Sequence, residues 1–254
     1  MSKQTWKAGN MLYPLPAVMV SCGDKEGNKN IITIAWTGTI CTNPAMVYIS
    51  VRPERYSYHM IRETEEFVIN LTTEELVRAT DYCGVRSGKN VDKWKEMNLH
   101  QEKASTLSYA PLIAESPVNI ECKVTEVKEL GSHHMFLAEV TAVHVDEKYM
   151  NENNKFELNE TGLLAYSHGE YLGLGKKLGT FGYSVKKTVT NAKSGQKNID
   201  KTSSDAKKST VKSSSGKKST GKKSTGKKNT TKKNSAKNSS AKNKTSNKKS
   251  SKKH

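Results

Sequence analysis

The stretch NIITIAWTGTICTNPAMVYISVRPERYSYHMIRETEEFVIN, residues 30–70, carries most of the information about the fold of this chain. Two runs within it, residues 31–36 and 45–51, are rich in Ile, Val and Tyr and are typical of β-strands. Hydroxyl and guanidinium groups border these runs: Thr37, Thr39, Thr42, Arg52, Arg55, Tyr56 and Ser57. Because such groups donate hydrogen bonds to phosphate oxygens, the stretch predicts a site for a phosphorylated ligand.

The charge of the chain is divided unevenly between two parts. Of the 42 Lys and Arg residues, 21 lie in residues 188–254, where only Asp200 and Asp205 oppose them, so that this tail has a net charge of +19. Residues 1–187 contain 21 Lys and Arg and 23 Asp and Glu, which gives a net charge of −2. The formal net charge of +17 therefore describes the tail and does not indicate a nucleic-acid-binding fold.

Residues 188–254 form a low-complexity segment without Phe, Trp, Tyr, Leu or Met. With 24 Ser and Thr beside the 21 Lys, the segment has too little apolar surface to offset about 1–2 kcal/mol of backbone ordering entropy per residue. We therefore expect it to be disordered. Its charge favours non-specific binding to polyanions through counterion release, and a solubilising or tethering appendage is the alternative.

Residues 1–187 are long enough for one domain with a sizeable core. No run of 18 apolar residues is present. The apolar patch at residues 12–22 contains Pro14 and Pro16, which favours a core strand over an export signal and leads us to expect a cytoplasmic location. The cysteines lack CxxC spacing and are expected to be reduced thiols packed in the interior: Cys22, Cys41, Cys83 and Cys122.

The pattern of the domain predicts a mainly β fold. Strands are expected at residues 17–22, 31–36, 45–51, 66–71, 118–130 and 134–145. Helices are expected at residues 56–63 and 73–82, the second with Thr72 or Thr73 as its N-cap. Strands joined by short turns favour a closed antiparallel barrel, and the GxGxxG and GxxxxGK[ST] phosphate motifs are absent.

Several segments, in this order, resemble the flavin reductase-like, FMN-binding split-barrel proteins, and among them the flavoredoxin-type members. They are the stretch 30–70 with FVIN at its end, DYCGVRSGKNVDKW at residues 81–94, and LLAYSHGEYLGLGKKLGTFGYSVKK at residues 163–187. The resemblance covers residues 6–187. It implies a six-stranded Greek-key split barrel with a few short helices, noncovalently bound FMN and a homodimer.

The resemblance also implies which residues bind the cofactor. The ring and ribityl chain of FMN would contact Thr33, Ala35, Trp36, Thr37 and Thr39, and the phosphate would lie near Ser50, Arg52, Arg55, Tyr56 and Ser57. Phe181, with Tyr183 beside it, would close over the ring from the C-terminal segment. Alternatives remain from the residues themselves: Trp36 and Tyr56 can fill core, and either arginine can form a surface ion pair with Glu54, Glu63 or Glu65.

The redox chemistry is expected from the flavin, so no catalytic acid, base or nucleophile is assigned. His168 is the one histidine in a flavin-adjacent motif, with an ordinary exposed hairpin residue as the alternative, and His133, His134 and His144 do not form a convincing metal set. Two functions stay open: an FMN reductase using NADH or NADPH, and an electron carrier reduced by a partner protein. SHGE at residues 167–170 stands where NADH-using flavin reductases have Gly-Asp-His, which counts against direct use of a nicotinamide donor.

Overall fold

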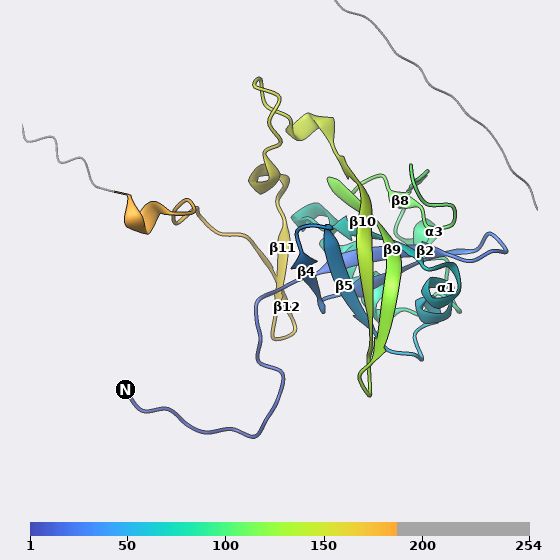
Figure 1. Cartoon of the computed structure of the whole chain (residues 1–254), viewed down its shortest axis with the longest axis horizontal. Coiled ribbons are helices and arrows are strands. Elements are labelled where there is room, and N and C mark those ends of the chain that lie inside the picture. The colour runs from blue at the N-terminus through green and yellow to red at the C-terminus, as the bar shows by residue number, and fades with distance from the viewer. Residues whose placement is uncertain (187–254) are drawn as a thin grey trace, which may run out of the picture. The chain divides into compact units, whose positions relative to one another are not determined.

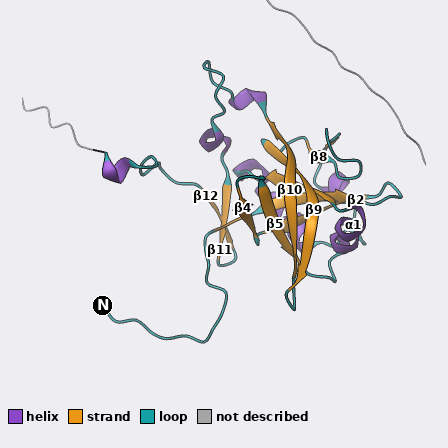
Figure 2. Cartoon of the chain, viewed as in Figure 1, coloured by secondary structure: helices purple, strands orange, loops and turns teal. Residues whose placement is uncertain are grey.

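The computed structural model describes residues 1–186, and strands make up most of the ordered elements (Figures 1 and 2). The predicted low-complexity tail lies outside the described residues. The strands are β1 (Leu15–Pro16), β2 (Val18–Gly23), β3 (Lys29–Ile34), β4 (Thr37–Cys41), β5 (Met46–Val51), β6 (Glu66–Leu71), β7 (Gln101–Glu102), β8 (Leu112–Ile113), β9 (Val118–Glu129), β10 (His134–Val145), β11 (Leu164–Ser167) and β12 (Glu170–Gly173).

Short helices connect and cover the strands. The α-helices are α1 (Tyr56–Thr64), α2 (Val77–Val85) and α3 (Lys93–Glu96). The 3₁₀ turns are η1 (Glu74–Leu76), η2 (Glu147–Tyr149), η3 (Leu158–Thr161) and η4 (Tyr183–Val185). Within the described part of the chain, none of these helices has the length and apolarity needed to cross a membrane.

The main sheet is antiparallel and has seven strands in the order β3-β2-β6-β9-β10-β5-β4. Its two edge strands, β3 and β4, are consecutive in sequence and separated only by Ala35 and Trp36. The sheet must therefore curl until its edges meet at this corner, where the Ser50 amide donates to the Trp36 carbonyl at 2.9 Å. The result is a split barrel, as predicted. It has one strand more than the six that the resemblance implied, because β4 pairs with β5 after the corner.

The six strands predicted from sequence are present with ends shifted by two residues or fewer. Helix α1 is also confirmed. The second predicted helix is divided into the turn η1 and helix α2, and Thr73 occupies the N-cap of η1 without a side-chain capping bond. The Thr72 hydroxyl instead donates to the Ala17 carbonyl and so joins this segment to the start of β2.

Strand β2 is buried along its whole length because it has hydrophobic material on both faces. Val18, Val20 and Cys22 pack inside the barrel, whereas Met19 packs on the opposite face in a cluster with residues of α2 and α3, such as Cys83 and Trp94. This two-sided burial explains why the strand reads as a continuous apolar run. It also fixes α2 and α3 against β3, where the candidate site lies. All four cysteines are free, and Cys41 is the one that is partly exposed.

Strands β1, β11 and β12 form a separate small sheet. The β11–β12 turn consists of His168 and Gly169, both with positive φ (49° and 88°), which suits the tight turn of a two-residue hairpin. His168 stacks on Tyr13, with ring centroids 4.7 Å apart. His168 therefore belongs to a hairpin tip.

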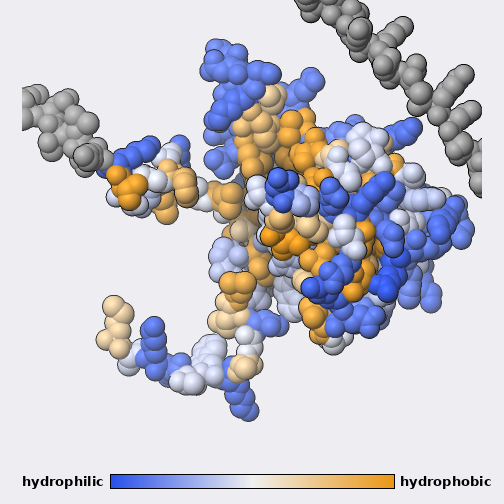
Figure 3. Space-filling model, viewed as in Figure 1, coloured by the Kyte–Doolittle hydropathy of each residue, from blue (hydrophilic) through white to orange (hydrophobic). Residues whose placement is uncertain are grey.

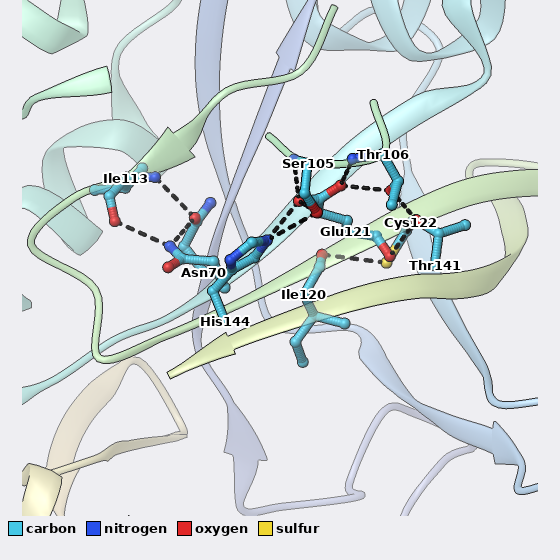
Figure 4. A network of polar contacts seen from close by, with 10 residues as sticks. Asn70, Ser105, Thr106, Ile113, Ile120, Glu121, Cys122, Thr141 and His144 are labelled. Atoms are coloured by element: carbon cyan, nitrogen blue, oxygen red, sulfur yellow. Dashed lines mark hydrogen bonds and ion pairs between the residues drawn. The ribbon is translucent and has the colours of Figure 1, made fainter. Parts of the chain in front are cut away.

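A buried carboxylate on β9 holds the loop that precedes β8 (Figure 4). Glu121 is fully buried and accepts hydrogen bonds from the backbone N–H groups of Ser105 and Thr106, both at 2.7 Å, and from both of their hydroxyls. His144 Nε2 lies 2.6 Å from the same carboxylate. Desolvation alone would raise the pKa of Glu121, but these hydrogen bonds outweigh it and lower the pKa to about 2. The network is therefore built around an ionised Glu121.

Ser105, His144 and Glu121 do not form a catalytic triad, although the residue types match. Both Ser105 Oγ, at 3.4 Å, and Glu121, at 2.6 Å, face the same nitrogen of His144. In a triad the acid and the nucleophile lie on opposite ring nitrogens. Ser105 Oγ also donates directly to Glu121 at 2.9 Å, which leaves no proton relay through the histidine. The network is structural.

Candidate functional site

Two adjoining depressions lie where β3, the end of β5 and the start of α1 meet. The first, which we call the basic recess, has a volume of ≈ 390 Å³ and is lined by side chains from β3, α1, α2 and the segment before α3. The second, the groove, has a volume of ≈ 160 Å³ and follows the β3–β4 corner and the end of β5. Ile32, Arg52 and Arg55 line both, so the two depressions form one continuous site.

The structure brings most of the predicted binding residues together here. Arg52, Arg55, Tyr56 and Ser57 line the basic recess, and Thr33, Ala35, Trp36 and Ser50 line the groove. Three others lie elsewhere. Thr37 is buried with its hydroxyl donating to the Tyr48 carbonyl at 2.6 Å, Thr39 is exposed on β4, and Phe181 is fully exposed in the segment after β12.

The two arginines that were predicted from sequence, Arg52 and Arg55, differ in their partners. Arg52 Nη1 lies 3.5 Å from Glu54 Oε1, so part of its charge is already matched on the surface. Arg55 occupies the N-cap position of α1, and within residues 1–186 it has no ion pair. Of these two, Arg55 is therefore the arginine that is free to bind an anion in the basic recess.

The first turn of α1 adds to the positive potential of the basic recess. This turn contains no acidic residue, and only its Tyr58 N–H has a helical acceptor, the Arg55 carbonyl at 2.9 Å, so the turn presents the positive end of the helix dipole. Ser57 in the same turn is almost fully buried and accepts a hydrogen bond from Asn30 Nδ2 at 2.8 Å. Ser57 also lines the basic recess. This combination is the usual physical basis of phosphate binding at a helix start.

Six residues of the basic recess that were not assigned from sequence lie in one segment: Cys83, Gly84, Arg86, Ser87, Gly88 and Lys93. They come from the DYCGVRSGKNVDKW segment, which supported only the family resemblance. The Asp92 carboxylate, which accepts from the Trp94 and Lys95 amides at 3.1 and 3.3 Å, starts α3 and so directs Lys93 inward. A Cβ on Gly88 would lie 2.2 Å from Asn30 Oδ1, so glycine is what permits this segment to close on β3. The sequence signal that could have indicated these residues is the Ser87-Gly88 pair between Arg86 and Lys89.

Lys93 is a buried cation without a carboxylate partner. It is 3% exposed, and its Nζ donates to the backbone carbonyls of Ile31 at 2.6 Å and Cys83 at 2.8 Å. Burial lowers the pKa of Lys93 to about 8, and the charge of Arg55 acts in the same direction. Within the described residues the charge of Lys93 has no opposing carboxylate. A ligand phosphate in the basic recess would supply the opposing negative charge.

The groove is bordered by two aromatic rings. Trp36 and His133 lie with ring centroids 4.5 Å apart, and both line the groove. Desolvation, followed by the charge of Arg52, lowers the pKa of His133. His134 faces elsewhere and contacts the Tyr58 hydroxyl at 2.8 Å. Among the described residues no group of three His, Cys, Asp or Glu side chains is placed to hold a metal ion.

The residues present fit a planar ligand that ends in a phosphate. The basic recess offers guanidinium, ammonium and hydroxyl donors with a helix start, and the groove offers backbone groups with aliphatic and aromatic side chains. A curled antiparallel sheet with such a site defines a split-barrel protein whose site suits an anionic, aromatic-containing ligand. Comparison with known proteins gives the family. Residues 10–175 match the Flavin reductase like domain, and the chain belongs to that family.

Solved structures and curated proteins agree with this assignment. The flavoredoxin of Desulfovibrio vulgaris (Miyazaki F) is 29% identical, with a TM-score of 0.67 over 73% of this chain and 100% of that one. A protein with a split barrel domain from Shewanella frigidimarina NCIMB 400 is 21% identical, with a TM-score of 0.60 over 67% of this chain and 86% of that one. The reductase component of a 4-nitrophenol 4-monooxygenase/4-nitrocatechol 2-monooxygenase from Rhodococcus opacus is 25% identical over 42% of this chain and 54% of its own length. Family membership supports a flavin-related redox function.

If Lys93 binds a phosphate, ligand affinity should depend on pH. The pKa of Lys93 is about 8 in the free protein, and a bound phosphate favours the protonated form. Above that pKa a proton must be taken up on binding, so the FMN dissociation constant should rise about tenfold between pH 7.5 and 9.5. Cys22 and Cys83, whose pKa values burial raises to about 11, stay neutral over this range.

Titrations of FMN across this pH range test the prediction. In the Lys93→Met variant FMN should bind more weakly, and its affinity should no longer vary between pH 7.5 and 9.5. A wild-type affinity that is constant over the same range would show that Lys93 does not contact the phosphate.

Proposed function

We propose that the chain binds FMN noncovalently, with the phosphate in the basic recess and the ring along the groove. The observation that supports this most strongly is Lys93, a buried ammonium group without an acidic partner among the described residues. Burial of an unmatched charge is costly, and it is typical of sites that bind the opposite charge. Arg55, Arg86 and Ser57 supply further donors around the same volume.

The residues of the chain would bind and orient the cofactor. Bound FMN supplies hydride and electron acceptance, which no side chain of this site provides. Arg55, Arg86 and Lys93 would neutralise the phosphate, and Trp36 with the backbone of residues 33–35 would contact the ring. Thr37, Thr39 and Phe181 remain predictions as cofactor contacts.

The reaction that we propose is electron transfer through this flavin, with the chain acting as a flavin reductase-like oxidoreductase. NADH or NADPH is the proposed electron donor. The similarity to the reductase component from Rhodococcus opacus favours this enzyme class. The similarity to a flavoredoxin favours the second candidate, an electron carrier that is reduced by a partner protein.

An anaerobic titration distinguishes the two candidates. The FMN-loaded chain is mixed with NADH or NADPH, and flavin absorbance is followed. Bleaching at a rate that saturates with nucleotide concentration supports the reductase. Flavin that stays oxidised with both nucleotides, but is bleached by dithionite, supports the electron carrier.

A homodimer is part of the proposal. Large apolar side chains remain exposed at the groove, on β4 and near the end of β10: Trp36, Ile40, Val143 and Val145. Hydrophobic surface is visible among polar residues on the face drawn in Figure 3. A second copy that covers such side chains would remove apolar area from water. Sedimentation velocity gives the oligomeric state directly.

The division into a flavin-binding domain, residues 1–187, and a basic tail, residues 188–254, also belongs to the proposal, as does a cytoplasmic location. Deletion of residues 188–254 should leave FMN affinity unchanged and should abolish salt-sensitive retention on DNA, because the deleted segment carries the net charge of +19. Loss of flavin on deletion would contradict this division.

A further inference from the structure

Two further depressions continue the surface of the site beyond the basic recess. The third depression has a volume of ≈ 550 Å³ and shares Tyr56 and Gly88 with the basic recess. The fourth has a volume of ≈ 740 Å³ and shares Lys29 and Gln101 with the third. The groove, the basic recess and these two depressions therefore form one continuous surface, which the groove joins through the basic recess.

Cationic side chains are concentrated on this surface. Seven Lys and Arg and three Asp and Glu line its four depressions, which gives a net charge of +4. The other 13 Lys and Arg and 20 Asp and Glu of residues 1–186 give −7. The cations other than the buried Lys93 are exposed or half-buried, and we call them the basic band: Lys29, Arg52, Arg55, Arg86, Lys89 and Lys103. The described part of the chain therefore has a positive face in spite of its negative total charge.

Bound FMN would occupy only part of the basic band. Its phosphate, with up to about two negative charges at neutral pH, would lie among the cations of the basic recess. Lys29, Lys89 and Lys103 line neither the basic recess nor the groove. Within the described residues, Lys89 and Lys103 have no ion pair. These cations therefore remain for a second partner.

The loop that carries Lys103 is fixed by the rest of the chain. Two buried carboxylates, Glu66 and Glu121, accept hydrogen bonds from four backbone N–H groups of this loop at 2.7 and 2.8 Å. Lys29 Nζ donates to the carbonyl of Tyr109 in the same loop at 2.5 Å. This part of the band is therefore ordered before a partner binds, which lowers the ordering entropy that binding costs.

The pattern of charge fits an acidic protein better than a nucleic acid. Glu54 and Glu102 are exposed within the band and would repel the uniformly charged backbone of a nucleic acid. A protein surface can match both signs, with acids opposite the band and a cation opposite Glu102. The groove opens on the same continuous surface, where Trp36 is 37% exposed. A redox protein docked on the band would therefore lie close to the proposed position of the flavin ring.

We propose that the basic band is the docking surface for an acidic electron-carrier protein that reduces the bound flavin. The inference rests on the proposed FMN site and develops its second candidate, the electron carrier that is reduced by a partner protein. If the partner carries single electrons, two reduced partner molecules are oxidised for each flavin that takes up two electrons, and the protons come from water.

Reduction of the FMN-loaded full chain by a reduced plant-type [2Fe–2S] ferredoxin, used as an acidic one-electron probe, tests the proposal. Anaerobic stopped-flow absorbance gives the second-order rate constant. The double variant Lys89→Glu/Lys103→Glu should lower this rate constant about tenfold at low ionic strength, because these charges steer the encounter. The difference should shrink at about 0.5 M salt, which screens exposed charges.

A matched variant reverses the same number of charges elsewhere. Lys123→Glu/Lys177→Glu changes two exposed lysines that line none of the four depressions, and both double variants keep residues 188–254 unchanged. The matched variant should change the rate constant by no more than about twofold. FMN affinity and bleaching by dithionite should be the same in both variants and the wild-type chain, since none of the four lysines lines the basic recess or the groove.

Amide resonances provide a measurement that does not depend on electron transfer. Addition of oxidised ferredoxin should shift the resonances of residues 88–90 and 101–104 in the full chain. These shifts should be lost in Lys89→Glu/Lys103→Glu and kept in Lys123→Glu/Lys177→Glu.

The outcomes separate this inference from the proposed function. An FMN-loaded chain that dithionite bleaches, but that ferredoxin does not reduce or reduces equally fast in all three proteins, would overturn the docking surface alone. Binding to a short DNA duplex that Lys89→Glu/Lys103→Glu weakens as much as it slows ferredoxin would identify a general polyanion surface and would also overturn it. A chain that takes up no FMN would overturn the proposed function and this inference with it.

Discussion

Replacement of Arg55 by alanine is expected to weaken FMN binding about 100-fold, because two charge-assisted hydrogen bonds to the phosphate are each worth about 1.5–3 kcal/mol. Arg55 lies at the start of α1, lines both the basic recess and the groove, and has no ion pair within residues 1–186. Fluorescence titration of FMN with the variant measures the loss.

Two control variants and one control ligand make this test specific. Arg52→Ala should have a smaller effect, because Arg52 is partly neutralised by Glu54 at 3.5 Å. Arg62→Ala removes an arginine from the last turn of the same helix and should leave FMN affinity unchanged. Riboflavin, which lacks the phosphate, should bind equally well to Arg55→Ala and to the wild-type chain. An equal loss for riboflavin and FMN would mean that Arg55 supports the fold and does not bind the phosphate.

Replacement of Glu121 by alanine is expected to lower the free energy of unfolding by about 3–5 kcal/mol, the usual cost of removing one partner from a buried charged network. The substitution leaves the N–H groups of Ser105 and Thr106 without acceptors and separates His144 from its carboxylate. Urea denaturation at neutral pH measures the change. Glu126→Ala, on the exposed part of the same strand, is the matched control and should change stability little, since its partner Lys128 is also exposed.

The same network predicts how stability depends on pH. The pKa of Glu121 is about 2 in the folded chain, against an ordinary value of 4.5, so its contribution is complete above pH 4.5 and is lost as the pH falls towards 2. The stability difference between wild type and Glu121→Ala should therefore shrink between pH 5 and pH 2. A difference that is constant over this range would show that these hydrogen bonds do not lower the pKa of Glu121.

Local sequence patterns were sufficient for the strands of the barrel. Alternation and β-branched residues marked β5 and β10, and the two-sided burial of β2 appears in sequence as an apolar run. Strand β4 was missed because Gly38 and polar residues interrupt its pattern, and its pairing depends on the corner at Ala35 and Trp36.

The candidate site was predictable only where its residues are close in sequence. Arg52, Arg55, Tyr56 and Ser57 follow one strand and begin one helix, so their proximity follows from local structure. Arg86 and Lys93 reach the same recess from a distant segment, through the packing of α2 and α3 on β3. The sequence does not show that these segments lie close together in space, and therefore Lys93 was not predicted to be a residue of the site.

The measurement that tests the central claim most directly is the flavin content of the purified chain. The visible spectrum is recorded, the released cofactor is identified by mass, and the apoprotein is titrated with FMN. We expect flavin absorbance with FMN as the released species, or stoichiometric uptake of FMN by the apoprotein. A chain that is colourless as purified and takes up no FMN at neutral pH would contradict the account.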